Sequence, residues 1–325
     1  MAGSDYDVSK DVLLPKSHAG AYTKDTRFEL VTAADPSQKS LRRFGRKWDV
    51  SNLYCDVEEM LAKESLDVLS IASSTDSHIC VLKQALKSSV KVVLIEKPVS
   101  NSLAEVVSLL QDVAESGKAV IVFYKRRWNK NNILIKKWIR EGVFGDVVKA
   151  SMYYSKGLLH NGTHGIDLMR WYFGEFKNVM GITNVSVGGE DVVDACFTLG
   201  NDASFFAMGT TGRDWNIWEL DILMEKGRIR FSLGGRKIDL MKPVEDPDFS
   251  GLKAFGFQDI TFENDWHNSM SNTVDSIYNI LECSAPVPCS YFDGVVALGW
   301  AVRAIESAKS GCESKSYVIN GLRRL

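Results

Sequence analysis

The sequence predicts an α/β protein with a Rossmann-type, doubly wound parallel sheet, followed by an α+β domain with a large, mostly antiparallel open sheet. Three observations predict this fold class. A short apolar run in the first half ends abruptly in charged residues, strand-like and helix-like segments alternate up to Tyr124, and strand-like segments beyond residue 190 follow one another directly. Alternation with helices indicates parallel strands with right-handed crossovers, whereas direct succession indicates antiparallel strands.

The central element is the stretch KVVLIEKP at residues 91–98. An uninterrupted apolar, β-branched run of this kind is typical of a strand that is buried on both faces of a parallel sheet. The carboxyl ends of such strands are where open α/β sheets bind ligands. Lys97 therefore lies at a candidate functional edge, unless it is an ordinary solvated lysine before a turn proline.

The first half contains the elements of a doubly wound sheet, and Gly117 stands where a helix C-cap favours glycine. Strands are predicted at residues 28–34, 53–54, 67–72, 92–95 and 119–124, and helices at residues 17–24, 37–44, 57–63, 77–87 and 103–116. These elements predict a first domain, with a doubly wound parallel sheet, at residues 1–123.

The second half, residues 124–325, is predicted to be the α+β domain. Helices are predicted at residues 131–141, 165–173, 264–283 and 292–310, and strands at residues 147–154, 192–199, 204–209, 218–224, 228–233 and 237–241. Short turns containing glycine or asparagine join the later strands, which predicts antiparallel pairing.

Composition excludes several classes of protein. The chain of 325 residues has a formal net charge of −2, so no nucleic-acid-binding surface and no basic membrane-binding patch is implied. No apolar run is long enough to span a bilayer, and Met1 does not begin a signal peptide. The six cysteines lack the spacing of a zinc site or disulfide framework. A cytoplasmic enzyme with reduced thiols and no bound metal is expected.

Asp35 ends the predicted strand at residues 28–34. An acidic residue at this position of a dinucleotide fold accepts hydrogen bonds from the ribose hydroxyls of adenosine and repels a 2′-phosphate. Asp35 therefore favours NAD over NADP as cofactor. A turn aspartate before Pro36 explains the residue equally well on local grounds.

The glycine loop that should cradle the cofactor pyrophosphate is missing before Asp35. A dinucleotide fold needs a strand, then G-x-G-x-x-G, then a helix, so that backbone N–H groups face the phosphates. Residues 1–3, Met-Ala-Gly, look like the tail of such a loop, and the strand that should precede it is absent. A misplaced start or a natural truncation is the simplest explanation. We therefore expect this chain to bind NAD poorly, because the neighbouring strands would expose unpaired backbone groups.

From residue 17 to about residue 174 the chain resembles the Gfo/Idh/MocA oxidoreductases, a family related to glucose-fructose oxidoreductase and inositol dehydrogenase. The resemblance rests on the order and spacing of several short motifs rather than on one of them. These motifs are Ser17-His18-Ala19, Ala34-Asp35-Pro36, Ile71-Ala72-Ser73 with His78, Glu96-Lys97-Pro98, Tyr124 with Arg126-Arg127-Trp128, Phe144-Gly145-Asp146-Val147, and Gly162-Thr163-His164 with Asp167-Leu168.

The resemblance implies an NAD(P)-dependent dehydrogenase or reductase that acts on CH–OH groups, with a sugar, cyclitol or sugar derivative as its small-molecule substrate. Lys97 and His164 correspond to the catalytic pair of the family. A histidine titrates near neutral pH and can take up the hydroxyl proton, while a lysine hydrogen-bonded to the same oxygen stabilises alkoxide character. Cofactor-binding positions implied by the resemblance are Asp35, Ser73, Ser74, Thr75, His78, Glu96 and Lys97.

One motif departs from the family pattern D-x-G-x-H, because His160 stands where the family has aspartate. A neutral histidine near Lys97 would not favour the charged ammonium as a carboxylate does. We keep His160 as a third candidate catalytic residue. His160 and His164 could instead be a metal pair on one helix face, but we expect Asn161 and Gly162 to interrupt such a helix, and no third ligand is evident.

The candidate substrate-binding residues are His160, Asn161, His164, Arg126, Arg127 and Trp128. Two guanidinium groups would suit an anionic sugar derivative, whereas a solvated, charge-rich linker face explains the arginines equally well. The resemblance further implies a cis peptide bond before Pro98 and a homodimer or homotetramer formed through the second-domain sheet. The alternative function is a catalytically degenerate member that binds a sugar or cofactor and acts as a regulator.

Overall fold

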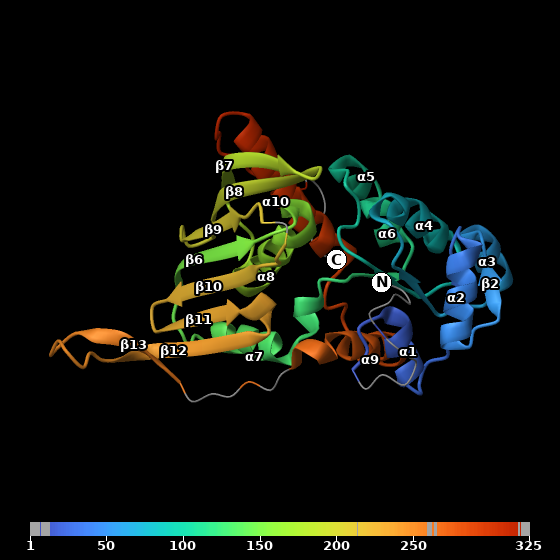
Figure 1. Cartoon of the computed structure of the whole chain (residues 1–325), viewed down its shortest axis with the longest axis horizontal. Coiled ribbons are helices and arrows are strands. Elements are labelled where there is room, and N and C mark those ends of the chain that lie inside the picture. The colour runs from blue at the N-terminus through green and yellow to red at the C-terminus, as the bar shows by residue number, and fades with distance from the viewer. Residues whose placement is uncertain are drawn as a thin grey trace. The chain divides into compact units, whose positions relative to one another are not determined.

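The computed structural model describes residues 7, 14–212, 214–258, 262, 265–317 and 319, which form two compact units (Figure 1). Among the described residues, the first unit comprises those up to Asn129 together with His267–Val295, and the second comprises Lys130–Trp266 and those from Val296 to residue 319. The first unit therefore extends slightly beyond the expected boundary at residue 123. It also includes helix α9 (Ser269–Cys283), which comes late in the chain.

The first unit contains parallel strands in two separate sheets, β1 (Thr32–Ala34) with β2 (Asn52–Tyr54), and β3 (Val68–Ile71) with β4 (Val92–Ile95) and β5 (Ala119–Val122). The residues of β4 are at most 1 % exposed, so the prediction of a fully buried central strand is confirmed. The predicted parallel sheet is confirmed as well.

Helices connect these strands in the predicted order. Side chains of Ser17, Ser37 and Asp56 cap the first three helices by accepting hydrogen bonds from backbone N–H groups of their first turns. The helix predicted at residues 103–116 is divided at Leu109, whose φ of −94° and ψ of −3° separate two short helices. The helices are α1 (His18–Lys24), α2 (Gln38–Trp48), α3 (Val57–Lys63), α4 (Thr75–Lys87), α5 (Leu103–Ser108) and α6 (Leu110–Glu115).

The two sheets of the first unit leave a position open between β1 and β3. Among the described residues β1 pairs only with β2, and β3 pairs only with β4. In a doubly wound sheet the first strand of the fold lies at this position, where the strand order reverses. No strand of the described residues pairs with the facing edges of β1 and β3, and the predicted absence of a first strand stays a prediction. The Met-Ala-Gly segment at residues 1–3 lies outside the described residues.

The second unit is built on one sheet of eight strands, in the order β13-β12-β11-β10-β6-β9-β8-β7 (Figure 1). Only β6 and β9 are parallel, so the expected mostly antiparallel sheet is confirmed. The strands are β6 (Val147–Tyr154), β7 (Asn178–Val187), β8 (Glu190–Thr198), β9 (Ser204–Gly209), β10 (Trp218–Met224), β11 (Gly227–Ser232), β12 (Lys237–Glu245) and β13 (Lys253–Phe257).

The sequence analysis missed β7 and β13, which are the two edge strands of this sheet. Edge strands pair on one side only, and their residues are more exposed, which weakens the apolar pattern that identifies a strand. Gly181 adds to the ambiguity in β7, since glycine is unfavourable inside a strand. It is required there, because a side chain at Gly181 would overlap the backbone of Ala304.

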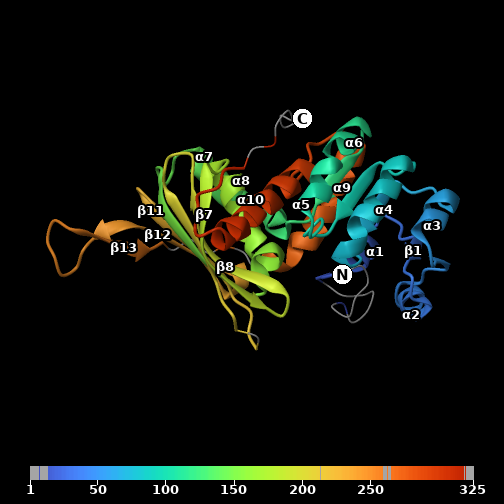
Figure 2. The ribbon, with the colours of Figure 1, turned by 90° about the horizontal axis from the view of Figure 1, so that it is seen from above.

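Helices α8 (Thr163–Phe173) and α10 (Tyr291–Lys309) lie along one face of the sheet (Figure 2). A cluster of aromatic rings fills the space beneath them, in which Phe176 contacts Phe197, Phe205 and Trp300. Helix α7 (Lys130–Arg140) packs beside α8. Side chains on the other face of the sheet are half-buried or exposed, as the burial of alternate residues in β6 and β10 shows.

Candidate active site

Lys97 follows β4 directly, at the carboxyl end of the buried strand. The peptide bond between Lys97 and Pro98 is cis, so the expectation of a cis bond is confirmed. Glu96, the preceding residue, is 6 % exposed, and its Oε1 lies 3.1 Å from Nε2 of His18. The His18 ring in turn meets the ring of Phe123 edge-on. The main chain at Lys97 is therefore held by a buried polar contact on one side.

The charge of Glu96 is stabilised in this environment. Burial acts to raise the pKa of Glu96, but the hydrogen bond from His18 and the positive charges of His18 and Lys97 outweigh it, and the pKa is held below its usual value. A carboxyl group with a lowered pKa in the folded state stabilises the protein above its unfolded pKa and loses this contribution as the pH falls.

Glu96→Gln is therefore expected to reduce the dependence of stability on pH in the acidic range. In the parent protein the free energy of unfolding should fall as the pH drops below the ordinary glutamate pKa of 4.5, and the variant should show a shallower fall. Urea denaturation at a series of pH values measures both slopes. Glu58→Gln, at an exposed glutamate of α3, is the matched control and should leave the slope unchanged. Equal slopes for Glu96→Gln and the parent would contradict the assignment.

His78 connects the turn after β3 to the segment that carries Lys97. Its Nδ1 lies 3.0 Å from the carbonyl oxygen of Pro98, and its Nε2 lies 3.1 Å from the carbonyl oxygen of Ser73. Both nearby atoms are carbonyl oxygens, so a neutral ring donates a hydrogen bond to one of these two main-chain segments and packs against the other. The side chain is 1 % exposed. These contacts favour a role for His78 in positioning the main chain beside Lys97, whereas direct contact with a cofactor stays a prediction.

Three of the expected cofactor-binding residues, Asp35, Ser73 and Ser74, line one cavity of about 1040 Å³ in the first unit. Oδ1 of Asp35 accepts a hydrogen bond from the backbone N–H of Ser37 at 2.8 Å, and its Oδ2 has no hydrogen bond within the described part of the chain. Ser74 is the N-cap residue of α4, and Thr75 is its first residue. A free carboxylate oxygen beside two seryl groups fits the ribose of an adenine nucleotide.

The residues that should meet the pyrophosphate do not fit it. The carboxylate of Asp7 occupies the first turn of α1, where it accepts hydrogen bonds from the backbone N–H groups of Lys16 at 2.8 Å and Ser17 at 2.9 Å and from the hydroxyl of Ser17. The sequence contains no glycine between Gly3 and Gly20. Backbone N–H groups that would face a pyrophosphate are thus already bound to an anion of the chain itself.

His164 lies in α8 of the second unit and is 8 % exposed, whereas His160 is exposed. The expectation that Asn161 and Gly162 interrupt a helix here was wrong. A π-helical turn (Gly157–Gly162) leads directly into α8, and Gly162 has helical dihedral angles, φ −64° and ψ −35°. Gly162 lies close to the side chains of Leu158 and Tyr154, so a side chain added here would require Leu158 to move.

Asn161 is held by its side-chain amide, which donates to the carbonyl oxygen of Ile217 at 3.3 Å. The alternative of a metal pair at His160 and His164 finds no support, since no group of three or more potential metal ligands occurs within the described ranges. Each of the three residues, His160, Asn161 and His164, belongs to the second unit, and Lys97 belongs to the first.

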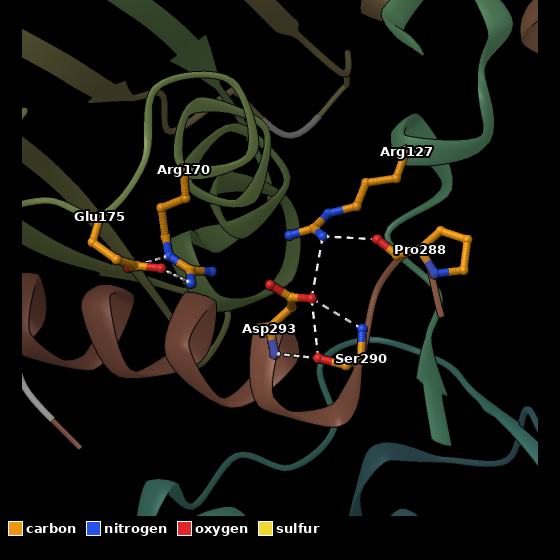
Figure 3. Close-up of polar contacts among 6 residues, drawn as sticks. All are labelled: Arg127, Arg170, Glu175, Pro288, Ser290 and Asp293. Carbon is orange, nitrogen blue, oxygen red and sulfur yellow. Dashed lines mark hydrogen bonds and ion pairs between the residues drawn. The ribbon is translucent and has the colours of Figure 1, made fainter. Parts of the chain in front are cut away.

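Arg126, Arg127 and Trp128 form a 3₁₀ turn (Lys125–Trp128) after β5 and are at most 5 % exposed. The interpretation of the arginines as a solvated linker face was therefore wrong. The guanidinium of Arg127 donates to the carbonyl oxygen of Pro288 at 2.9 Å and lies 3.3 Å from Oδ2 of Asp293 (Figure 3). An arginine committed to a buried ion pair stabilises the fold, so these contacts favour a structural role for Arg127; a substrate contact stays a prediction.

The sequence did not reveal three interactions in the first unit. Asp7 binds the backbone before α1, His18 contacts Glu96, and Asp293 pairs with Arg127. Asp293 and Ser290 form a reciprocal cap at the start of α10, in which the Asp293 carboxylate accepts from the Ser290 N–H at 3.0 Å and the Ser290 hydroxyl accepts from the Asp293 N–H at 3.2 Å. The spacing S-x-x-D was the available signal for this cap. No local pattern predicts the pairing of Asp293 with Arg127.

Both halves of the chain match domain models of one family of known proteins. Residues 14–124 match the model of an oxidoreductase family with an NAD-binding Rossmann fold, and residues 155–315 match the C-terminal alpha/beta domain of the same oxidoreductase family. The chain is 24 % identical over 203 residues to D-apiose dehydrogenase of Paraburkholderia graminis, an alignment that covers 56 % of this chain and 54 % of that protein. It is 25 % identical over 160 residues to myo-inositol 2-dehydrogenase of Thermotoga maritima, with 45 % and 48 % covered.

The fold is similar to that of levoglucosan dehydrogenase in complex with NADH and levoglucosan, with a TM-score of 0.78 and 16 % identity over 92 % of this chain and 95 % of that one. In sequence, the chain spans about half the length of these two curated relatives. The structural likeness establishes the fold, and the family models establish the kind of each domain.

Proposed function

Because the chain belongs to the Gfo/Idh/MocA family of oxidoreductases, we propose that it transfers a hydride between nicotinamide and an alcohol or ketone of a sugar, cyclitol or sugar derivative. Relatives named as D-apiose dehydrogenase and myo-inositol 2-dehydrogenase support a carbohydrate-like substrate. The position of Lys97 carries the proposal. Lys97 lies at the carboxyl end of a fully buried strand, next to Glu96, whose carboxylate contacts His18.

In this proposal one side chain accepts the hydroxyl proton of the substrate and another stabilises the negative charge on its oxygen. His164 takes up the hydroxyl proton of the carbinol, since imidazole titrates near neutral pH. The ammonium of Lys97 donates a hydrogen bond to the same oxygen and stabilises its negative charge as the C–H bond breaks. NAD, when bound, supplies the hydride acceptor. The proton on His164 then passes to solvent.

NAD binding is expected to be weak, with a dissociation constant in the millimolar range or above. The described residues fit the adenosine end of the cofactor, but Asp7 places a carboxylate where the pyrophosphate would lie. Two anions at one helix terminus repel each other, and the helix dipole favours only one of them. Isothermal titration of the protein with NAD and, as control, with adenosine measures this directly. Micromolar binding of NAD would overturn this expectation.

A second candidate function is favoured by the same misfit at the pyrophosphate. A catalytically degenerate member would bind a sugar or cofactor and act as a regulatory protein, without turnover. His160 in place of the aspartate that the family resemblance implies supports this function, because it removes a carboxylate from the motif. Binding of a sugar panel by calorimetry, without any NADH formation at saturating NAD, would favour the regulator over the dehydrogenase.

We further propose that the protein is a cytoplasmic homodimer or homotetramer formed through the open face of the second-unit sheet. This face carries the exposed side chains of Tyr153 and Met180, at 49 % and 40 %, beside the half-buried Phe206 and Met208. Within the described ranges no helix has both the length and the apolar character that crossing a membrane requires.

Tyr153→Glu is expected to shift the protein to monomer in light scattering coupled to size exclusion, because a carboxylate cannot be buried in the interface without a cost in free energy. Ile133→Glu, at an exposed apolar residue of α7 away from the sheet, is the control and should leave the mass unchanged; an unchanged mass for Tyr153→Glu would contradict the interface.

A further inference from the structure

The open face of the second-unit sheet, which lies opposite α8 and α10, continues onto the hairpin of β12 and β13. Asp221, a half-buried residue of β10 between buried neighbours, lies on this face. Opposite residues of paired strands point to the same face, and so do alternate residues of one strand. The register places Asp221 opposite Arg230, Arg228 opposite Met241, and Met241 opposite Phe257. Phe257 therefore points to the same side of the sheet as Asp221.

The open face carries an apolar area on β6 and β9. Asp221 is opposite Ser151 of β6, and Ser151 is opposite Phe206 of β9, so Phe206 lies on the open face as well. Tyr153 and Met208 follow at alternate positions of the same two strands and are opposite each other. Tyr153 is 49 % exposed, and Phe206 and Met208 are half-buried. Their side chains are thus available to a partner.

A second apolar area lies on the hairpin, which extends beyond the neighbouring strands (Figure 1). Phe257 is 70 % exposed, and Phe255, at the alternate position of β13, is 38 % exposed. Exposed aromatic side chains that lie together favour contacts between proteins, because each buries a large apolar surface when it is covered. The open face therefore has one apolar area on each side of β10 and β11.

Charged side chains of β10 and β11 separate the two apolar areas, and the two strands carry opposite signs. Glu219 and Asp221 of β10 are acidic, whereas Arg228 and Arg230 of β11 are basic. Nε of Arg228 donates to Oδ1 of Asp221 at 2.9 Å, and Nε of Arg230 lies 3.4 Å from Oδ2 of the same carboxylate. The side chain of Arg230 is 48 % exposed, so its guanidinium remains accessible to a further acidic group.

An acidic strand beside a basic strand complements a rotated copy of itself. A two-fold axis that runs parallel to the strands, between β10 and β11, stacks the open faces of two subunits with reversed strand order. Strand β10 of one subunit then lies over β11 of the other, so acidic side chains face arginines. The same rotation brings β13 over β9, because each is the third strand from the axis.

A two-fold axis perpendicular to the strands gives a less favourable pairing of charges. Each strand would lie over its own copy, so that Asp221 would face Asp221 and Arg230 would face Arg230. Like charges that face each other across a partly desolvated interface repel, whereas opposite charges attract. The division of charge between β10 and β11 therefore favours reversed strand order.

We propose that two copies of this chain stack their open faces with reversed strand order, so that the hairpin of each subunit covers β9 of the other. Rotation about an axis parallel to the strands keeps the position along the strands. Because Phe257 is on one row with Arg228, Lys149 and Ser204, it comes beside Ser204 and Phe206 of the partner subunit.

The inference rests on the proposed association through the open face. It adds the register of the two subunits and gives the hairpin a partner. It does not depend on the proposed hydride transfer.

The substitution Phe257→p-benzoylphenylalanine, which introduces a photoreactive side chain, tests the register. Illumination of the full chain is expected to give a covalent dimer on a denaturing gel, and mass spectrometry should place the new bond within residues 204–208. In its own subunit residue 257 is five strands, about 24 Å, from β9, so this bond can form only between subunits. Phe249→p-benzoylphenylalanine, at an exposed phenylalanine between β12 and β13, is the control and should give little covalent dimer.

Phe257→Glu measures the contribution of the hairpin. The dissociation constant of the dimer is expected to rise about 100-fold or more, because the apolar contact occurs twice in a symmetric dimer. Sedimentation equilibrium over a range of protein concentrations measures this constant. The side chain is exposed in the single subunit, so the circular dichroism spectrum should not change. Phe249→Glu is the matched control and should leave the constant unchanged.

Two results would overturn the register but leave the open face as the interface. One is a bond from residue 257 to β12 or β13 of the second subunit, and the other is an unchanged dissociation constant for Phe257→Glu, in a dimer that Tyr153→Glu still disrupts. A parent protein that remains monomeric at the highest concentration measured would overturn the register and the proposed association together.

Discussion

Asp293→Ala is expected to lower the free energy of unfolding by about 3–5 kcal/mol, because it leaves the guanidinium of Arg127 buried without its carboxylate. The side chains of Arg127 and Asp293 are 2 % and 10 % exposed, so water cannot replace the lost partner (Figure 3). The same substitution removes the acceptor for the N–H and hydroxyl of Ser290 at the start of α10. Chemical denaturation monitored by tryptophan fluorescence measures the loss.

Two further variants separate the ion pair from the cap. Asp293→Asn keeps an acceptor for Ser290 but no charge, so it should be less destabilising than Asp293→Ala. The double substitution Arg127→Met with Asp293→Asn should recover part of the loss, since it removes the buried charge as well. Glu59→Ala, which breaks the exposed pair of Glu59 with Lys63, is the control and should change stability little. A loss for Asp293→Ala no larger than this control would contradict the role of the buried pair.

Lys97→Ala is expected to lower turnover by about 10²–10⁴-fold under the proposed function, the range typical for removal of a positioned proton-transfer or charge-stabilising group. NADH formation at saturating NAD, with a panel of sugars and cyclitols, measures the effect. Thermal unfolding should change little, because the side chain follows the strand rather than forming part of its buried run.

Lys83→Ala is the matched control, since Lys83 is an exposed lysine of the neighbouring helix α4. It should leave turnover unchanged. His164→Asn is expected to lower turnover as well and to remove the acidic limb of the pH profile, because asparagine cannot take up a proton. Turnover by Lys97→Ala equal to that of the parent would exclude a catalytic role for this lysine.

The parts of the fold that could be predicted are those in which one local pattern decides the structure. The apolar run before Glu96 predicts a buried parallel strand because it is short, rich in β-branched residues and flanked by charged residues and a proline. The alternation in β9 and β10 predicts half-buried strands for the same reason. Edge strand β13 carries the weaker pattern of a segment that is exposed on most of its surface, and the sequence analysis missed it.

The parts that could not be predicted depend on contacts between residues far apart in the chain. Nothing near Arg127 in the sequence indicates that Asp293 will neutralise it, and nothing near Glu96 indicates His18. The continuation of the helix through Gly162 follows a π-helical turn that no local pattern of the sequence indicates. The candidate catalytic residues were named by motif, and their surroundings emerged only from the tertiary structure.

The position of β6 in the eight-stranded sheet bears on how that sheet is assembled during folding. Strands β7, β8 and β9 form one meander of consecutive hairpins, and β10 to β13 form another. The two meanders meet only through β6, which pairs with β9 on one side and β10 on the other. Each meander closes short loops, whereas docking of β6 closes loops of many residues at a larger entropic cost. Joining of the two meanders by β6 is therefore expected to limit the rate at which this unit folds.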